Sequence, residues 1–338
     1  APPPSAPGRP VILDVDTGTD DALALLLALG CPALRVLAVT CVSGNVDVGR
    51  VTEATLRVLD AASPDLVVPV ASGADRPLVE PVRHCPEIHG QDGLGDLVPP
   101  LPASRRVPCC EHAAELLNAT LRSAGERVTV VALGPLTNLA LAIRLAPGLW
   151  RDGVESVWWM GGGVGIGGNA TQWGEANAVY DPEAAHIVLD SGLPVTMYPW
   201  DMYLKVGYTA AELAALGLSE CLEGGHPAAT LAARILHREM RHFQVEEAMI
   251  GDAGVVAAIV LGAGAVTTRR LHVEVELHGR STRGMTVCDV RPFADPPDRA
   301  KSAPNVDVVV DVDVAALKGC FSSHVLLRPA EASGARAA

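Results

Sequence analysis

The chain has 338 residues, of which 49% are hydrophobic, and its formal net charge is -13 at pH 7. This length and hydrophobic content are sufficient for one large folded domain with a sizeable core. The acidic balance argues against a nucleic-acid partner, because proteins that follow a phosphate backbone carry clustered Lys and Arg. The longest apolar run, residues 255–266, is shorter than the roughly 20 residues that span a bilayer, so no membrane partner is expected.

The two ends of the chain and its cysteines indicate whether the protein is secreted and in which cellular compartment it works. Residues 1–10 lack the basic and apolar regions of a signal peptide and are predicted to be a disordered leader, although an upstream segment could precede them. Residues 331–338 are predicted to be a disordered tail, which leaves 11–330 as one domain. The eight cysteines form no CxxC pair, which is typical of free thiols in a reducing compartment. We therefore expect a cytoplasmic protein.

Strand and helix patterns alternate along the first part of the chain. Short β-branched apolar runs followed by turn residues predict buried strands at residues 11–15, 35–40, 66–70, 128–133, 154–160 and 193–198. The segments between them predict helices, one ending at Gly30 and others at about 47–62, at about 111–124, after GPLTN and from 181. This alternation predicts an α/β fold with an open, mostly parallel, Rossmann-like sheet flanked by helices.

The C-terminal part departs from the alternation. Residues from about 209 to 262 are predicted to be helical. The alternating runs LHVEVEL (271–277) and MTVCDV (285–290) predict a hairpin, a small antiparallel addition to the fold. The run VDVVVDV (306–312) is either a further strand or an edge. Because no repeat or linker-like stretch follows residue 10, a single domain is expected.

Four carboxylates crowd the end of the first predicted strand, at Asp14, Asp16, Asp20 and Asp21. In an open α/β sheet, ligands bind outside the carboxyl ends of the strands, which is where these residues fall. Helix N-capping is the alternative interpretation, but a cap needs only one or two carboxylates. Four carboxylates at close range repel one another, and a hard cation such as Ca²⁺ or Mg²⁺ relieves that repulsion. The sequence therefore favours a metal site over capping alone.

Polar side chains also follow three other predicted strands. Asn45 follows the strand at 35–40, and GPLTN follows the strand at 128–133. After the strand at 154–160 comes a Gly-rich loop that contains Asn169, Glu175 and Asn177. The carboxyl ends of the parallel strands form one rim of the sheet. Amide and carboxylate groups that converge on this rim suit a polyhydroxylated ligand.

Two other site types have partial matches. Residues 163–168 satisfy GxGxxG, but a dinucleotide-binding motif opens a helix directly and this one runs into a polar loop. The pair Asp14 and Asp16 also looks like the start of a haloacid dehalogenase-type phosphotransferase, with Asp252 in its acidic GD motif. That family expects a second acidic residue soon afterwards, and AGVVAA supplies none.

The segment DVDTGTDDALALLLAL resembles the DxDxGxDDA signature of the inosine-uridine nucleoside hydrolase family. Further matching segments follow in the family's order: SGN at 43–45, IHGQDGLGD at 88–96, ALGPLTNLALA at 132–142, MGGGVGIGGNATQWGEANAVYDPEAA at 160–185, GDA at 251–253 and TRGMTVCDVR at 282–291. The resemblance implies a Ca²⁺-dependent enzyme that hydrolyses the N-glycosidic bond of ribonucleosides to free base and ribose. It also implies a homodimer or homotetramer.

The resemblance further implies a role for each matched residue. In the family a Ca²⁺ ion binds two ribose hydroxyls and a water molecule. The implied metal ligands are Asp16, Asp21, the backbone carbonyl of Leu133 and Asp252, with Asp16 also acting as general base for the water. The implied ribose contacts are Asp20, Asn45, Asn169, Glu175 and Asn177, with the Met160 backbone nearby, while Asp14 supports the ligand loop. A ring of acceptors suits the oxocarbenium-like transition state of glycosidic cleavage.

The sequence departs from the family pattern where the leaving group is activated. Many relatives place a His directly before the last metal-binding Asp, and purine-specific relatives place a Trp there, but this chain has Gly251. Ala176 also replaces an aromatic residue of the Gly-rich loop. His89 lies in a matched motif, and we favour a catalytic pocket role for it over that of an ordinary loop histidine.

Other candidates for the base pocket are weaker. His237 and His242 lie in a charged helical segment and are expected to face solvent. Trp173 and Tyr203 are candidates for base stacking, whereas Trp158 and Trp159 at a strand end are expected in the core. Two questions stay open at this point: the base preference, and whether the protein is a catalytically impaired Ca²⁺- and ribose-binding protein, which the loss of His at 251 favours.

Overall fold

The computed structural model describes residues 8–63, 65–218, 225–291 and 302–329. The first strand begins at Arg9, so two residues assigned to the leader belong to the sheet. The expected tail at 331–338 and the first seven residues of the expected leader lie outside the described residues.

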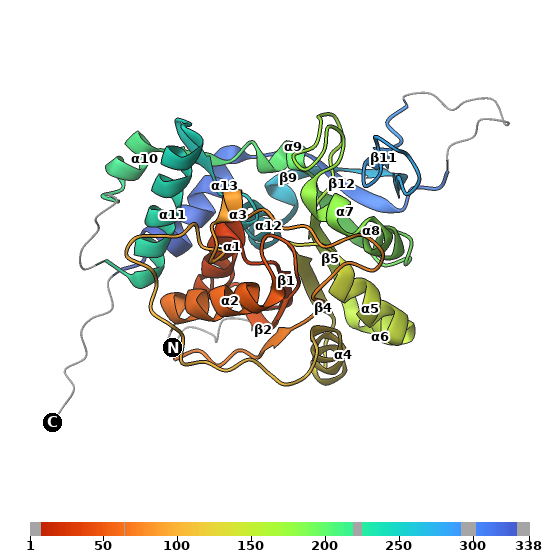
Figure 1. The fold of residues 1–338 in the computed structure, drawn as a ribbon, viewed down its shortest axis with the longest axis horizontal. Coiled ribbons are helices and arrows are strands. Elements are labelled where there is room, and N and C mark those ends of the chain that lie inside the picture. Colours follow the sequence, from red (N-terminus) through yellow and green to blue (C-terminus); the bar gives the residue numbers. More distant parts are fainter. Residues whose placement is uncertain (1–7, 64, 219–224, 292–301, 330–338) are drawn as a thin grey trace.

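An eight-stranded sheet forms the centre of the molecule, with the strand order β3-β2-β1-β4-β5-β6-β12-β9 (Figure 1). All neighbouring strands are parallel except β12 and β9, which confirms the predicted mostly parallel α/β sheet. In sheet order the strands are Val70–Ser72, Leu34–Cys41, Arg9–Val15, Val128–Ala132, Val154–Met160, Val195–Tyr198, Val306–Val312 and Val266–Leu271.

Helices cover both faces of this sheet, because alternate side chains of each strand point to opposite faces and both sets are apolar. In β1, Val11 and Leu13 belong to one hydrophobic core and Ile12 belongs to the other. The first core is covered by α1 (Thr19–Gly30), α2 (Val48–Ala62), α11 (Pro227–Phe243), α12 (Ala253–Leu261) and α13 (Val314–Phe321). The second is covered by α4 (Ala113–Ser123), α5 (Thr137–Leu145), α6 (Pro147–Gly153) and α8 (Pro182–Leu189), on the opposite side of the strands in Figure 1.

Short elements complete the fold outside the main sheet. The predicted hairpin is confirmed as the antiparallel pair β10 (Val273–Val275) and β11 (Thr286–Cys288), and β11 lies beyond β12 in Figure 1. A second antiparallel pair joins β7 (Gly207–Thr209) to β8 (Glu247–Met249). The remaining short helices are α3 (Pro86–His89), α7 (Ala176–Tyr180), α9 (Trp200–Tyr203) and α10 (Ala210–Ala215).

Two expectations about elements were wrong in detail, and one open question was decided. The strand expected at 66–70 begins only at Val70, because Val67 is 92% exposed and Pro69 lacks a backbone donor. The expected helical region from 209 to 262 also contains the three-residue strand β8. The run at 306–312, expected as either a further strand or an edge, is a further strand inside the sheet, since β9 pairs with its outer side. Most side chains of β9 are polar and exposed, so this edge strand lacks the apolar pattern that reveals buried strands.

The described residues include no helix that is long and apolar enough to cross a bilayer. The cysteines that the structure describes are free thiols, and Cys31, Cys41, Cys85 and Cys320 are buried. Trp159 is fully buried and Trp158 packs partly buried against the first core, as expected for both.

Two helices far apart in the sequence position the polar rim of the sheet. The helix α1 follows the end of β1 directly, and α12 packs against α1 although it lies near the other end of the chain. Both helices are almost entirely apolar and buried, so their packing is stabilised by the hydrophobic effect over their whole length. Their N-termini, which carry Asp20, Asp21 and Asp252, are thereby brought to the same place.

We predict that Leu26→Ala lowers the free energy of unfolding by about 2 to 5 kcal/mol, because Leu26 is fully buried in α1 and its truncation leaves a cavity. Val67→Ala is the control, since Val67 is 92% exposed and its truncation should change stability by less than about 0.5 kcal/mol. Denaturant unfolding at one fixed protein concentration measures both. Equal losses in the two variants would contradict the placement of α1 in the core.

Candidate active site

A cluster of three carboxylates lies at the carboxyl end of the sheet. Asp20 and Asp21 begin α1, and Asp252 directly precedes α12. Each residue offers a carboxylate oxygen within 4.8 Å of the oxygens of the other two. Asp21 and Asp252 are buried and Asp20 is partly buried. The predicted convergence of these residues is therefore present, and we call them the carboxylate cluster.

The carboxylate cluster contains too few hydrogen-bond donors for its oxygens. Oδ2 of Asp21 accepts hydrogen bonds from the Gly18 amide at 2.8 Å and from Asn45 Nδ2 at 3.3 Å. One buried oxygen of each member, the Oδ1 atom, has no hydrogen-bond partner among the described residues. Burial, followed by the charge of Asp20, raises the pKa of Asp21 and of Asp252 well above the usual range. Unpaired buried carboxylates are costly, and a hard divalent cation with oxygen ligands fits this donor set.

Asp16 lies beside the carboxylate cluster on the loop between β1 and α1. Its Oδ2 accepts the Asn45 amide at 2.9 Å, and burial followed by the charges of Asp21 and Asp20 raises its pKa. Two loops approach it closely, since a Cβ on Gly44 would lie 2.0 Å from its Oδ2 and one on Gly134 would lie 2.7 Å from its Oδ1. The tightest group of carboxylates in the structure is thus Asp20, Asp21 and Asp252. The resemblance instead implies Asp16, and not Asp20, as a metal ligand beside Asp21 and Asp252.

Asn177 connects two strand ends at the rim. Its Nδ2 donates to the carbonyl oxygen of Leu133, after β4, at 2.7 Å and to that of Met160, at the end of β5, at 3.1 Å. The Leu133 carbonyl is an implied metal ligand, and a carbonyl oxygen with two lone pairs can accept this bond and still offer one to a cation. Leu133, Met160 and Asn177 therefore lie together, and the resemblance implies roles at one site for all three.

Glu175 caps the short helix α7 from the end of the Gly-rich loop. Its carboxylate accepts the amides of Gly162 at 2.8 Å, Asn177 at 2.9 Å and Ala178 at 3.3 Å. It is buried, and burial raises its pKa to about 7 in spite of these donors. Asn169 lies exposed on the same loop and accepts the Ala176 amide at 2.8 Å, so its side chain is less enclosed than the other predicted site residues.

The Gly-rich loop is fastened to the rest of the rim by two side chains. Asp201 accepts the amides of Val164 at 2.8 Å and Gly165 at 2.9 Å. Thr286 accepts the Gly163 amide at 2.9 Å and donates to the Gly163 carbonyl at 2.8 Å. No helix starts at residues 163–168, so the GxGxxG segment lacks the context of a dinucleotide-binding motif.

His89 is buried against the start of α1. Its Nδ1 accepts the Thr19 amide at 3.2 Å and lies 3.2 Å from Thr19 Oγ1 and 3.8 Å from Asp20 Oδ1. Because Nδ1 is an acceptor, the neutral ring carries its hydrogen on Nε2. Burial lowers the pKa of His89, which favours this neutral form. The structure therefore places His89 beside Asp20 as a neutral Nε2 donor.

The other predicted base-pocket residues make bonds elsewhere. Nε2 of His237 lies 3.2 Å from the Leu218 carbonyl, and Nε2 of His242 lies 2.8 Å from the Glu87 carbonyl. His242 is exposed, as expected, whereas His237 is only partly exposed. Trp173 is 50% exposed on the Gly-rich loop.

Asp14 forms a buried network beneath the site. Its Oδ1 accepts Thr40 Oγ1 at 2.6 Å and Asn138 Nδ2 at 2.8 Å, and burial raises its pKa to about 7. Asn138 also donates to the Cys41 carbonyl at 3.0 Å and accepts the Ala74 amide at 2.9 Å. The sequence analysis placed Asp14 in support of the loop but missed Thr40 and Asn138 as its partners. A polar residue in a buried apolar strand, and the Asn that ends GPLTN, were the available signals.

Gly251, the departure from the family pattern, adopts a φ of +51°, in the left-handed region. A Cβ at this position would lie 2.6 Å from Cε2 of Tyr203 and 2.8 Å from Cβ of Asp20. The Tyr203 ring therefore fills the space into which a larger residue at position 251 would project.

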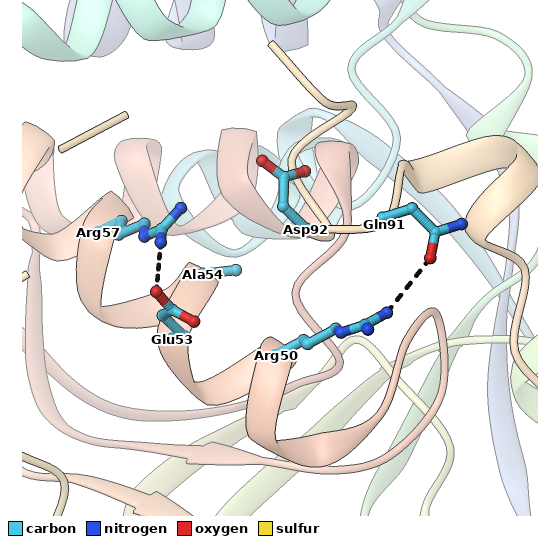
Figure 2. A pocket seen from close by; sticks show the side chains of 6 residues that line it. All are labelled: Arg50, Glu53, Ala54, Arg57, Gln91 and Asp92. Carbon is cyan, nitrogen blue, oxygen red and sulfur yellow. Dashed lines mark hydrogen bonds and ion pairs between the residues drawn. The ribbon is translucent and has the colours of Figure 1, made fainter. Parts of the chain in front are cut away.

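A separate surface pocket of about 220 Å³ lies between α2 and the loop after α3, as Figure 2 shows. Its lining contains none of the predicted site residues and consists of Arg50, Glu53, Ala54, Arg57, Gln91 and Asp92. Arg57 pairs with Glu53 and Arg50 donates to Gln91, so these polar side chains already have partners within the pocket.

Comparison with known proteins places this geometry in context. The family model described as inosine-uridine preferring nucleoside hydrolase matches residues 11–319. The chain is 36% identical over 310 residues to a pyrimidine-specific ribonucleoside hydrolase, RihA, of Salmonella schwarzengrund, covering 90% of this chain and 94% of the relative. It is 37% identical over 286 residues to an inosine-uridine preferring nucleoside hydrolase of Leishmania major, covering 84% and 88%.

Solved structures give the same result. A plant nucleoside hydrolase is similar with a TM-score of 0.84 and 29% identity, over 95% of this chain and 100% of that one. A purine-preferring ribonucleoside hydrolase from Gardnerella vaginalis is similar with a TM-score of 0.80 and 29% identity, over 94% and 98%.

We predict that Gly251→Ala lowers the free energy of unfolding by about 1 to 3 kcal/mol, because a side chain at this positive φ is strained and its Cβ meets the Tyr203 ring. Gly148→Ala is the control, since Gly148 lies in α6 with open space around it. This variant should raise the free energy of unfolding by about 0.5 to 1 kcal/mol. Denaturant unfolding measures both variants. A Gly251→Ala protein as stable as Gly148→Ala would contradict the contact with Tyr203.

Proposed function

The chain belongs to the inosine-uridine preferring nucleoside hydrolase family, and from this membership we propose that it hydrolyses ribonucleosides at the carboxylate cluster with the help of a Ca²⁺ ion. The observation that carries the proposal is the set of buried Oδ1 atoms of Asp20, Asp21 and Asp252 that lack hydrogen-bond partners among the described residues. Keeping such groups together is costly, and a ligand that pairs with them lowers that cost.

We assign the cation to Asp16, Asp21, the Leu133 carbonyl and Asp252, with Asp20 at the border between cation and sugar. Two properties support this set of ligands. All of them offer buried oxygen atoms at one rim of the sheet, and three of them are carboxylates, which a hard cation prefers as ligands. When bound, a divalent cation lowers the pKa of a coordinated water molecule and offsets the repulsion among the carboxylates.

Asp16 is proposed to take a proton from the attacking water. The Asn45 amide at 2.9 Å fixes its Oδ2, while the close approach of Gly44 and Gly134 restricts the movement of its side chain. The orientation of a base is a large part of its effect, because proton transfer needs it within hydrogen-bond reach. In this proposal the Asp16 carboxylate accepts the proton from the water directly.

The ribose is proposed to bind between Asp20, Asn45, Glu175 and Asn177, with Asn169 closing over it from the exposed loop. Glycosidic cleavage develops positive charge on the sugar ring, and carboxylate and carbonyl oxygens placed around the ring stabilise that charge. The Gly-rich loop can hold these groups because Asp201 and Thr286 fasten it.

His89 is proposed to assist the departure of the base. Its Nδ1 is bonded to Thr19, so Nε2 is the atom that carries a hydrogen. As a neutral ring it stabilises negative charge on the leaving base through a hydrogen bond, which is a weaker form of general acid catalysis than proton transfer from an imidazolium.

The second candidate is a protein that binds Ca²⁺ and ribose but does not catalyse hydrolysis, and Gly251 is the observation that favours it. Measuring ribose released from a panel of purine and pyrimidine nucleosides, with and without a chelator, separates the two. The panel also determines the base preference, since the relatives are named for both pyrimidine and purine substrates. A homodimer or homotetramer, testable by light scattering, and a cytoplasmic location stay predictions.

We predict that Asp16→Asn folds normally but loses turnover on the order of a thousandfold or more in kcat, because it loses a cation ligand and the general base together. The control is Asp311→Asn, since Asp311 lies on β12 as an exposed carboxylate that pairs with Lys205 at 2.7 Å, and this variant should keep most of the turnover. Steady-state ribose release measures both, and exhaustive chelation of the wild type should have an effect like that of Asp16→Asn. Near-normal kcat in Asp16→Asn, or activity that survives chelation, would refute the assignment.

We predict that His89→Ala slows inosine and uridine hydrolysis by about 10², the lower end of the range for general acid catalysis, while sparing p-nitrophenyl riboside, because that leaving group needs no acid. The comparison of the two substrate types within one variant is the control for folding and sugar binding. Equal losses on both would show that His89 holds the sugar or the fold of the pocket. No loss on either would remove His89 from the reaction.

A further inference from the structure

Tyr203, at the end of α9, connects two parts of the carboxylate cluster. Its hydroxyl donates to Oδ2 of Asp20 at 2.9 Å. Its ring packs on Trp200, with ring centroids 4.5 Å apart, and its edge meets the backbone of Gly251, the residue before Asp252. One side chain thus contacts Asp20 directly and the segment that carries Asp252.

These contacts give Tyr203 fixed partners at its ring and at its hydroxyl. Trp200 packs against the ring, Gly251 lies at its edge, and the hydroxyl is bonded to Asp20. A tyrosine hydroxyl has a reference pKa of about 10, so the phenol is a neutral donor at neutral pH. The structure therefore supplies Asp20 with a permanent neutral donor.

That donor distinguishes the two oxygens of Asp20. Tyr203 holds Oδ2, while the buried Oδ1 has no hydrogen-bond partner among the described residues and lies 3.8 Å from Nδ1 of His89. A hydrogen bond to one oxygen restrains the rotation of the carboxylate and so favours one orientation of the other oxygen. Oδ1 is thereby kept free for a hydroxyl group of the substrate.

We propose that Tyr203 is a positioning residue that fixes the Asp20 carboxylate so that its Oδ1 accepts a ribose hydroxyl, an arrangement that the absence of a side chain at Gly251 permits. The inference rests on the proposed function of this site for its sugar ligand. It assigns Tyr203 to sugar affinity, separately from cation binding and from proton transfer by Asp16.

Tyr203→Phe tests the proposal because it removes only the hydroxyl and keeps the ring on Trp200 and Gly251. The matched control is Tyr208→Phe, whose hydroxyl lies 2.6 Å from both Ser322 Oγ and the Lys318 carbonyl. Tyr203→Phe should raise KM for a ribonucleoside roughly tenfold and change kcat less than about threefold, as expected when a contact equal in ground and transition states is weakened. Tyr208→Phe should change neither. Unchanged KM in Tyr203→Phe would overturn the proposal.

Calorimetry gives a readout that does not depend on turnover. With Ca²⁺ present, Tyr203→Phe should bind D-ribose roughly tenfold more weakly, while its Ca²⁺ affinity stays within about twofold of wild type, because Asp20 is assigned to the sugar. An equal loss of Ca²⁺ affinity would overturn the sugar assignment and make Asp20 a cation ligand. Wild-type protein that binds ribose without hydrolysing nucleosides would contradict the proposed function alone, whereas failure to bind ribose would contradict both.

A double-mutant cycle separates positioning from a general structural effect. If Tyr203 acts through Asp20, then Tyr203→Phe should change ribose affinity by less than about twofold in an Asp20→Asn background. Additive losses would show that Tyr203 acts independently of Asp20 and would overturn the proposal.

Discussion

Several carboxylates are buried at one point with too few donors, and the arrangement of the rim follows from that electrostatic cost. Asp16, Asp21 and Asp252 all have raised pKa values, because burial and mutual repulsion oppose their charge. In Asp20 and Asp21 the donors among the described residues are directed at Oδ2 and leave the buried Oδ1 open. Such a site is poorly compensated by the protein alone and well suited to a cation and a sugar diol.

The apolar packing beneath the rim holds the carboxylates together in spite of their mutual repulsion. The helices α1 and α12 are buried along nearly their whole length and pack on each other, so their acidic N-terminal ends cannot separate to relieve the repulsion. The helix N-termini also contribute partial positive charge, which favours carboxylates there. Below them, Asp14 ties β1 to β2 and α5 through Thr40 and Asn138, which holds the first loop from the side of the sheet.

The local pattern of the sequence predicted most of the fold and the acidic part of the site. Buried parallel strands are apolar on both faces, so β1, β2, β4 and β5 could be located to within about two residues. Asp16, Asp20 and Asp21 are close in sequence, so their proximity followed from the chain itself. The polar edge strand β9 and the short β8 had no such signal, because their pairing depends on neighbours that are distant in sequence.

The sequence by itself determined the α/β architecture, the crowding of carboxylates after β1 and, through its motifs, the family. Only the tertiary structure decided which side chains complete each carboxylate. The bond from Tyr203 to Asp20 joins residues 183 positions apart, and that from Asn138 to Asp14 joins residues 124 apart. It also decided that Gly251 leaves no empty space, because the Tyr203 ring fills it. Contacts of this kind depend on where helices and strands pack in three dimensions, which the local pattern of residues does not specify.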